Sequence, residues 1–363
     1  MEQGYFFTGF PGFICNQLIR EMLSKCYGNV YVLVLPAMAE RAKSERHAIM
    51  QEFSLEDGQF RLIEGDITVP GLAISTVDMG ELKEKVTHVF HLAAIYDLAV
   101  PKDAAFRVNV EGTRNVNEWV KGMKNIQRYT YFSTAYVAGK REGILYEDEL
   151  VRPPGFKNYY EETKFEAEGL VEKMKAAVPV TIIRPGIVKG NSRTGETIKF
   201  DGPYFIMNFI DRLRFMPWLP RMGTSKAVVN LVPVDYIIEA AAFLTLLEKS
   251  AGRTYHLTDP KPYSVSEIYE MMLFELLNKK PKGTLPIGLA KAGLQLSTVR
   301  KYLGVEKEAL DYFTWLGEFD CTQAQDDLKG SGIQCPDFKE GISSMADFYM
   351  KKKNEPTYRI KIV

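Results

Sequence analysis

Short apolar runs alternate with longer amphipathic stretches through the first half of the chain. The runs are continuously apolar, which is typical of strands buried on both faces of a parallel sheet, and they lie at 5–8, 30–35, 60–63, 88–92, 129–132 and 180–183. The stretches between them carry apolar residues at three- and four-residue spacing, as crossover helices do, at 17–25, 43–53, 103–121 and 161–176. The pattern predicts an α/β fold with a doubly wound parallel sheet.

The regular alternation ends near Pro185, and a different pattern follows. A glycine-rich loop over 186–202 leads into mixed segments, with helical patterns near 234–249 and 264–277. We therefore expect a sheet domain over 1–190 and a smaller C-terminal lobe over 191–363. A strand-like run at 253–257 indicates that the chain returns to the sheet domain around 228–260.

Composition restricts the partners more than it restricts the fold. Of 363 residues, 46% are hydrophobic, and 46 basic side chains balance 46 acidic ones. Phosphate neutralisation needs a basic field, so we expect no nucleic-acid partner. The apolar run at 240–247 is too short to span a membrane, and the N-terminus has no secretory pattern. We therefore expect a cytoplasmic protein without a membrane span.

Cysteines and histidines give no sign of a metal site. The four cysteines form no CxxC pair, so we expect reduced thiols; they are Cys15, Cys26, Cys321 and Cys335. The four histidines lack the spacing of metal ligands; they are His47, His88, His91 and His256. The sequence predicts no bound metal.

A glycine-containing loop follows the first predicted strand and opens a helix. Gly9 allows a tight turn, and Gly12 allows the backbone to approach a pyrophosphate at the helix N-terminus. The third small position of such a loop holds Cys15, where glycine is more usual. The loop predicts a dinucleotide site formed by Thr8, Gly9, Phe10, Pro11, Gly12, Phe13 and Ile14. A purely structural glycine turn is the alternative.

Further candidate contacts follow the third and fourth predicted strands. Asp66 and Ile67 come after the third strand, where a carboxylate can accept a hydrogen bond from an adenine amino group. A simple turn aspartate is the alternative. Ala93 and Ala94 follow the fourth strand, near the expected switch in strand order, where small side chains leave room for ribose and nicotinamide.

The end of the second predicted strand bears on which nicotinamide cofactor binds. NAD sites place Asp or Glu there to hold the ribose, but this chain has Leu35, and residues 34–37 contain no carboxylate. Three cations follow in the next helix: Arg41, Lys43 and Arg46. Two interpretations are open for them, contact with the 2′-phosphate of NADP or a solvated helix face. We predict NADP, with Arg41 or Lys43 contributing, and keep NAD as the alternative.

A proton-transfer pair is predicted at the start of a later helix. Tyr160 and Lys164 are four residues apart and therefore share a helix face. A nearby ammonium lowers the pKa of a phenol, so that Tyr160 can exchange a proton as hydride moves. A helix with a buried Tyr and an exposed Lys is the alternative. The fifth strand ends in Ser133 and Thr134, and we favour Thr134 as the donor to a substrate oxygen.

Together these motifs resemble the extended short-chain dehydrogenase/reductase superfamily over about the first 190 residues, and more loosely to about residue 270. Segments 109–113, 132–137 and 184–196 look like its thioester-reductase and fatty acyl-CoA reductase branch. The resemblance implies a Rossmann-like fold and the reduction of acyl thioesters with NADPH. The branch usually has Arg where this chain has Leu35.

The resemblance also implies roles for particular residues. Thr134, Tyr160 and Lys164 are the implied catalytic residues, and Asn109 is expected to steady the Lys through the active-site helix or a bound water. Tyr160 and Lys164 are also expected to contact the cofactor. The other cofactor contacts expected in the second half of the sheet domain are Pro185, Gly186 and Val188.

The leading hypothesis is an NAD(P)H-dependent reductase of an acyl thioester, aldehyde or ketone, supplied as a small molecule or on a carrier. Its alternatives are a sugar-nucleotide epimerase or dehydratase on the same fold, and an NAD(P)-binding regulatory protein without turnover. Formation of a homodimer is left as an open alternative. Apolar residues in the lobe form either a substrate wall or core; they are Tyr204, Phe205, Met207, Phe209, Phe215, Met216, Trp218 and Leu219.

Overall fold

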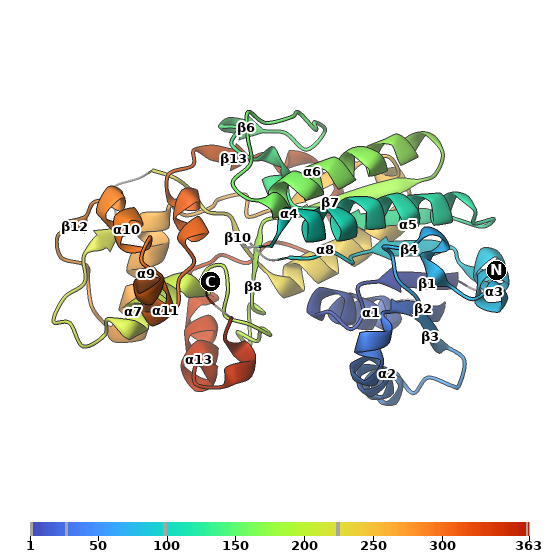
Figure 1. The fold of residues 1–363 in the computed structure, drawn as a ribbon, viewed down its shortest axis with the longest axis horizontal. Helices are drawn as coiled ribbons and strands as arrows, with labels where there is room; N and C mark the ends of the chain where they lie inside the picture. Colours follow the sequence, from blue (N-terminus) through green and yellow to red (C-terminus); the bar gives the residue numbers. More distant parts are fainter. Residues whose placement is uncertain (1–2, 26–27, 97–99, 223–225, 361, 363) are drawn as a thin grey trace.

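A seven-stranded parallel sheet forms the centre of the larger domain (Figure 1). The computed structural model describes residues 3–25, 28–96, 100–222, 226–360 and 362. The strand order is β11-β7-β5-β4-β1-β2-β3. These strands are β1 (Gln3–Thr8), β2 (Gly28–Val34), β3 (Phe60–Glu64), β4 (His88–His91), β5 (Arg128–Phe132), β7 (Val180–Pro185) and β11 (Thr254–Leu257).

The strand order confirms the predicted doubly wound sheet. All six strands predicted in the first half are present, and the run near 253–257 returns to the sheet as β11 beside β7. β2 and β3 extend from one side of β1, whereas β4, β5 and β7 extend from the other. Because the order reverses between β1 and β4, a crevice opens there at the carboxyl ends of the strands.

Helices cover both faces of the sheet. α1 (Phe13–Lys25), α2 (Ala39–Phe53) and α8 (Val234–Leu246) pack on the face that contains Tyr5 and Phe7. α3 (Thr76–Lys85), α5 (Gly112–Lys121) and α6 (Tyr159–Glu172) pack on the opposite face, against Phe6. Successive side chains of β1 are therefore buried on opposite sides, which explains why the strands are continuously apolar in sequence.

The single helix predicted over 103–121 was wrong in its middle. α4 (Lys102–Ala105) and α5 are joined by a π-helical turn, η3 (Phe106–Glu111). Within this turn, the amide of Asn109 accepts a hydrogen bond from the backbone N–H of Ile95 at 2.9 Å and donates to its carbonyl at 3.3 Å. These contacts with a distant loop stabilise a wider turn that residue spacing does not reveal.

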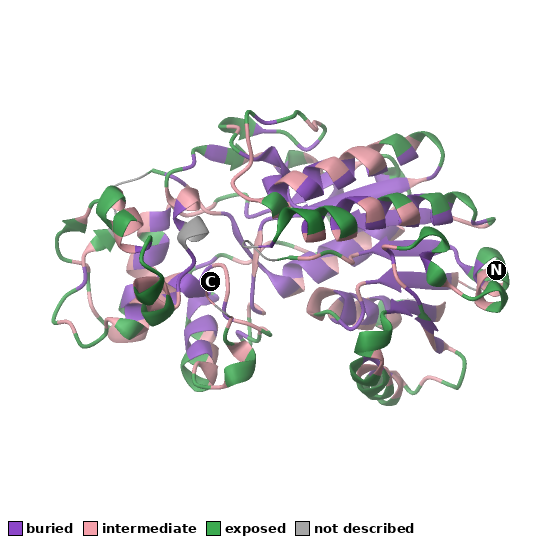
Figure 2. Ribbon diagram, viewed as in Figure 1, coloured by how far each residue is buried: buried purple, intermediate pink, exposed green. Residues whose placement is uncertain are grey.

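The C-terminal lobe is mainly helical and has its own apolar clusters. α7 (Tyr204–Arg212), α9 (Val265–Leu277) and α13 (Ile342–Lys352) share one cluster. α10 (Ile287–Gly293) and α11 (Ser297–Leu303) contribute to a second cluster around Phe205. Figure 2 shows that these two short helices are far less buried than the strands of the sheet.

The remaining elements of the described chain are short. The paired short strands are β6 (Gly143–Leu145) with β13 (Gly317–Phe319), β8 (Ile187–Lys189) with β10 (Leu231–Pro233), and β9 (Arg221–Met222) with β12 (Thr284–Leu285). The short helices are η1 (Pro36–Met38), η2 (Pro70–Ala73), η4 (Ala135–Ala138), η5 (Lys173–Ala176), η6 (Glu248–Ser250), η7 (Lys307–Phe313) and η8 (Pro356–Tyr358).

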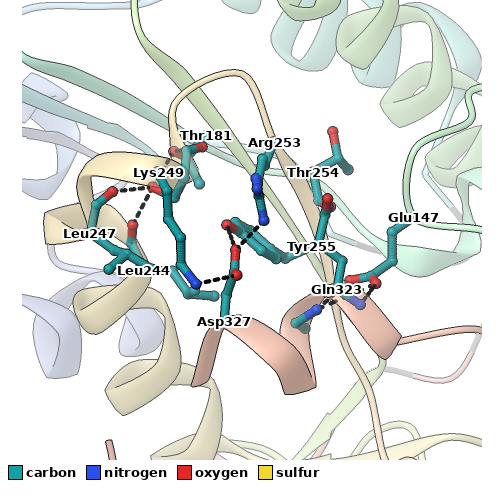
Figure 3. A network of polar contacts seen from close by, with 12 residues as sticks. Glu147, Thr181, Leu244, Leu247, Lys249, Arg253, Thr254, Tyr255, Gln323 and Asp327 are labelled. Carbon is teal, nitrogen blue, oxygen red and sulfur yellow. Dashed lines mark hydrogen bonds and ion pairs between the residues drawn. The ribbon is translucent and has the colours of Figure 1, made fainter. Parts of the chain in front are cut away.

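Polar contacts attach α12 (Thr322–Leu328) to the edge of the sheet (Figure 3). The buried carboxylate of Glu147 accepts hydrogen bonds from the backbone N–H groups of Gln323 at 2.6 Å and Ala324 at 3.1 Å. Asp327, at the other end of α12, pairs with Arg253 at 2.7 Å. Burial raises the pKa of Glu147 to about 7, although these N–H groups oppose the shift.

Candidate active site

One large cavity runs along the carboxyl ends of the strands and continues into the lobe. Its volume is about 1030 Å³, at the upper end of the range for small-molecule sites. The walls include the loop after β1, the end of β5, the start of α6 and residues of α7, α9 and α10. The crevice of the sheet and the apolar interior of the lobe thus form a single space.

The glycine loop forms one end of this cavity. Gly9 has φ +98°, and a Cβ atom there would lie 2.9 Å from the backbone nitrogen of Ala93. A Cβ atom on Gly12 would lie 2.6 Å from the carbonyl oxygen of Gly9. The loop therefore presents bare backbone at the start of α1, which fits a pyrophosphate. All seven predicted residues line the cavity: Thr8, Gly9, Phe10, Pro11, Gly12, Phe13 and Ile14.

Thr8 also joins the ends of β1 and β4. Its hydroxyl accepts a hydrogen bond from the N–H of Ala93 at 3.1 Å and lies 2.7 Å from Nδ1 of His91. Nε2 of His91 lies 3.0 Å from the hydroxyl of Thr113. Burial, and then the positive charge of Lys164, lower the pKa of His91 to about 3. A neutral His91 thus holds the loop that carries Ala93 and Ala94, both of which line the cavity.

The residues predicted for the adenine end divide into two groups. Asp66, Ile67, Leu35 and Arg41 line the cavity. Asp66 also accepts a hydrogen bond from the N–H of Thr68 at 2.8 Å, so it has the turn role that was kept as its alternative. Arg41 is exposed at the cavity wall, on α2.

The other two cations of the second crossover helix do not reach the cavity. Lys43 pairs with Glu40 at 2.7 Å on the exposed face of α2. Arg46 donates to the carbonyl of Phe60 at 2.7 Å. Of the three cations considered for a 2′-phosphate, Arg41 is the one that lines the cavity.

The first turn of α6 brings Tyr160 to the cavity wall. Asn158 caps this helix by accepting a hydrogen bond from the N–H of Glu161 at 2.9 Å. Tyr160 is hydrogen-bonded to the side chain of Thr134, and burial raises its pKa above the ordinary value, with the Thr134 contact opposing the shift. The expected lowering of this pKa by Lys164 was wrong for the protein without ligands, because burial outweighs the other contributions.

Lys164 is buried, so the alternative of an exposed lysine on an amphipathic helix was wrong. Its ammonium donates to the phenol oxygen of Tyr131 at 2.8 Å and to the carbonyl of Phe132 at 2.6 Å. Burial lowers the pKa of Lys164 to about 7, and the carboxylate of Glu168 opposes this shift. Lys164 lines the same cavity as Tyr160.

Asn109 reaches Lys164 by two routes. Its side chain donates to the hydroxyl of Thr163, the neighbour of Lys164 on α6, at 3.0 Å. Its carbonyl accepts a hydrogen bond from Thr113 at 2.6 Å, and the Thr113 hydroxyl is in turn hydrogen-bonded to Tyr131. The side-chain route matches the contact with the active-site helix that the resemblance implied.

Sequence reasoning missed Tyr131 and the buried partners of Ser133. Tyr131 lies inside a predicted strand, where a tyrosine reads as an apolar core residue. Ser133, the alternative to Thr134, instead hydrogen-bonds Glu168, which pairs with Arg184 in the buried interior. The two hydroxyls after β5 therefore have different environments, and the only available sequence signal was their position beyond the strand end.

The second half of the sheet domain supplies the opposite wall. Pro185, Gly186 and Val188, the cofactor contacts that the resemblance implies, all line the cavity. A Cβ atom on Gly186 would lie 2.8 Å from the carbonyl of Asn230, so the chain passes closely over the start of β10. A side chain at position 186 would therefore collide with this neighbouring segment.

The apolar residues predicted in the lobe have three different positions. Phe205 and Phe209 line the cavity. Tyr204, Met207 and Leu219 are buried in the core of the lobe, and Met216 packs against that core. Phe215 and Trp218 are exposed, by 73% and 46%. Both readings of this stretch were therefore right in part, and neither anticipated the exposed pair.

Within the described residues, no cluster of three or more His, Cys, Asp or Glu side chains is suited to hold a metal ion. Cys15, Cys321 and Cys335 are free thiols, and burial raises the pKa of each. Cys26 lies outside the described residues. None of the helices in the described ranges has the length and apolar character needed to cross a bilayer.

The parallel sheet, the glycine loop at its switch point and the Tyr160–Lys164 pair define a nucleotide-binding α/β domain of the extended short-chain dehydrogenase/reductase type. Residues 7–241 match the model of the male sterility protein family, an NAD-binding domain. This match covers more than half of the chain, and the chain therefore belongs to that family.

Similar proteins extend the comparison. The chain is 26% identical to fatty acyl-CoA reductase wat of Drosophila melanogaster over 274 residues, covering 66% of this chain and 53% of the relative. It is 27% identical to fatty acyl-CoA reductase 1 of Rattus norvegicus, covering 64% and 52%. The chain thus spans about half the length of these curated relatives. The terminal R domain of the myxalamid PKS-NRPS pathway has the same fold, with a TM-score of 0.81 and 24% identity over 98% of this chain and 92% of that domain.

Proposed function

We propose that the protein reduces the carbonyl group of a hydrophobic substrate with NADPH or NADH, and that acyl thioesters are its main substrate class. The observation that carries the proposal is the single cavity that joins the glycine loop, Tyr160 and the apolar wall of the lobe. A cofactor held along the sheet and an apolar substrate held in the lobe would meet beside Tyr160.

The proposed chemistry needs one hydride and one proton. The nicotinamide cofactor supplies the hydride when it is bound across the carboxyl ends of the strands. Reduction of a thioester then gives an aldehyde and a free thiol, with the cofactor oxidised. Tyr160 donates the proton to the oxygen or sulfur that becomes negative, and Thr134 donates a hydrogen bond to the substrate oxygen.

Lys164 has two tasks in this proposal. Its ammonium binds the cofactor ribose, and its charge favours the ionised form of Tyr160 after proton transfer. Asn109 steadies Lys164 through Thr163 on the active-site helix. The protein thus holds the ammonium of Lys164 in position before the substrate enters.

The walls of the cavity favour an acyl substrate over a sugar nucleotide. Behind Tyr160 the lining is apolar, as expected for a hydrocarbon chain; it includes Phe205, Phe209, Ile268, Leu289, Leu294 and Val299. A sugar nucleotide would leave its hydroxyls without partners along such a wall. The names of the fatty acyl-CoA reductases cited above agree with this substrate class.

The test uses the purified chain with NADPH or NADH and a panel of acyl-CoA thioesters, aldehydes, ketones and sugar nucleotides, followed by nicotinamide absorbance. We expect turnover with acyl-CoA thioesters of increasing chain length, with a KM that falls as the chain lengthens. Release of one thiol for each aldehyde formed would establish the stoichiometry. Turnover confined to sugar nucleotides would refute the proposal.

A further inference from the structure

The far end of the lobe exposes an unusual set of large apolar side chains. We call this set the lobe tip; it consists of Phe215, Trp218, Phe274, Leu289, Leu296 and Tyr302, each more than 40% exposed. Isolated exposed apolar residues are ordinary on protein surfaces, but a group of six on one end is not. In Figure 1, α7, α9, α10, α11 and β12 are all at this end, opposite the end that carries α3.

Three contacts bring segments of the lobe tip together. The ammonium of Lys279 donates to the carbonyl of Met216 at 2.8 Å, within the loop that carries Phe215 and Trp218. β9 and β12 pair in parallel, which joins this loop to the segment that leads into α10. The hydroxyl of Tyr302 lies 3.5 Å from the carbonyl of Arg212, so α11 contacts the end of α7.

The charges around the lobe tip are one-sided. Residues 279–304 contain five lysines and Arg300 but no Asp or Glu, in a chain whose total charge is zero. Lys280, Lys282 and Lys301 are exposed and form no ion pair within the described chain. Glu275 is an exposed carboxylate nearby.

Other carboxylates close to the lobe tip are already neutralised. Asp211 pairs with Lys353 at 2.6 Å and Glu270 with Arg221 at 2.7 Å. Asp311 likewise pairs with Lys291 at 2.9 Å. The unpaired charge at this end is therefore mainly positive.

The lobe tip and the cavity share a helix. Leu289, a member of the lobe tip on α10, lines the cavity and is 64% exposed. Ala290 and Gly293 on the same helix line the cavity as well. One wall of the cavity is therefore formed by a helix that also contributes to the lobe tip.

We propose that the lobe tip docks on the surface of an anionic lipid bilayer, with the α10 wall of the cavity next to the lipid. Aromatic and aliphatic side chains bordered by lysines suit the boundary between acyl chains and anionic headgroups. A second copy of this chain would bring like charges together, and protein interfaces are depleted in lysine. The proposal stands on this surface and not on the proposed reaction.

The binding test uses the full chain, without substrate, and two kinds of vesicle. One is phosphatidylcholine alone, and in the other phosphatidylglycerol replaces part of it. We expect cosedimentation with the anionic vesicles to be at least about tenfold stronger and to weaken as salt is added. Equal binding to both vesicles, or binding to neither, would overturn the proposal, as would self-association that leaves the tip covered.

Trp218 provides a native probe of the contact. The other two tryptophans, Trp119 and Trp315, are buried. We therefore expect anionic vesicles to shift the tryptophan emission to the blue, and brominated lipids to quench the Trp218 contribution. An unchanged emission spectrum at vesicle concentrations that sediment the protein would place the contact elsewhere and refute the proposed surface.

Variants separate the two contributions. The double variant Phe215→Ser/Trp218→Ser should weaken vesicle binding at least about tenfold. The double variant Lys280→Glu/Lys282→Glu should remove the preference for anionic lipid. The matched control is Val77→Ser on α3, since Val77 is 81% exposed at the opposite end. Binding by both tip variants equal to that of the Val77→Ser control would contradict the proposal.

Discussion

The two ends of the cavity are built by different means. At the sheet end, the walls are backbone and short side chains held by hydrogen bonds, such as those that join Thr8 to Ala93. At the lobe end, the walls are mainly apolar side chains on helices, such as Phe205 and Leu289. A polar site tolerates few residue types, whereas an apolar wall accepts many of similar volume. In the proposed function, the sheet end would determine the chemistry and the lobe end would determine which molecules reach it.

The largest expected effect concerns proton transfer at the sheet end. Tyr160→Phe should lower turnover by about 10²–10⁴-fold and leave cofactor binding nearly unchanged, because it removes the proposed proton donor and keeps the ring. Steady-state rates and fluorescence titration with cofactor measure the two effects separately. Tyr159→Phe is the matched control, since Tyr159 is the exposed neighbour on α6. Full activity in Tyr160→Phe would exclude it as the donor.

The second expected effect tests the glycine loop. Gly12→Val should weaken cofactor binding by at least about tenfold, because even a Cβ atom there would lie 2.6 Å from the carbonyl of Gly9. Calorimetry measures the affinity, and circular dichroism establishes that the variant is folded. Gly80→Val on α3 is the control, since a Cβ atom there meets no atom within 4 Å. Unchanged affinity in a folded Gly12→Val protein would refute the site.

The sheet end of the cavity was more predictable from the sequence than the lobe end. The parallel sheet and the glycine loop were predictable because buried strands and a backbone cradle restrict residue type strongly. The role of Tyr131 was not predictable, because a tyrosine in an apolar strand is usually core, and only tertiary packing puts its hydroxyl beside Lys164. The π turn around Asn109 depends on Ile95, 14 residues away, and residue periodicity carries no sign of that contact.

The lobe was the part that the sequence described least. Its boundaries follow no alternation of strands and helices, and α10 and α11 are only seven residues each. Pattern analysis of 204–219 could not separate cavity wall, core and surface, because Phe205, Met207 and Phe215 are all apolar and differ only in what packs against them. Such assignments need the tertiary structure.

A third prediction concerns stability at the edge of the sheet. The folded-state pKa of Glu147 is raised from 4.5 to about 7, so folding favours its protonated form. The stabilisation is fully present below about pH 4.5 and is lost as pH rises through about 7, and it amounts to about 3 kcal/mol. Glu147→Gln should remove this dependence.

Urea unfolding at several pH values measures the contribution of Glu147, as the difference in unfolding free energy between the parent protein and Glu147→Gln. Glu142→Gln is the control, since Glu142 is an exposed carboxylate on the same segment. A difference between parent and Glu147→Gln that stays constant from pH 4.5 to 8 would show that Glu147 does not titrate in this range.

The fourth prediction tests cofactor preference at the adenine end. Arg41 lines the cavity, whereas Lys43 pairs with Glu40. Arg41→Ala should therefore reduce affinity for NADPH by about tenfold and leave affinity for NADH nearly unchanged, because one charge-assisted phosphate contact contributes about 1.5–3 kcal/mol. Lys43→Ala is the matched control on the same helix. A parent protein that prefers NADH, or an Arg41→Ala variant with equal losses for both cofactors, would contradict the assignment.

The smallest expected effect concerns the support of Lys164 and would sharpen the account of the sheet end. Tyr131→Phe removes one of the two oxygen atoms that accept hydrogen bonds from the Lys164 ammonium. Losing an acceptor disfavours the charged form, so the pKa of Lys164 should fall further below about 7.

Cofactor affinity should weaken as pH rises through the pKa of Lys164, because the ammonium is the form that binds. In Tyr131→Phe this decline should occur about 0.5–1 pH unit lower, with a few-fold loss near neutral pH. The control is Tyr129→Phe on the same strand, which loses a buried hydrogen bond to Asn117 of 2.8 Å but does not contact Lys164. If both variants shift the pH profile equally, the cause is general loosening of β5, whereas a shift confined to Tyr131→Phe identifies its hydroxyl as the group that positions Lys164.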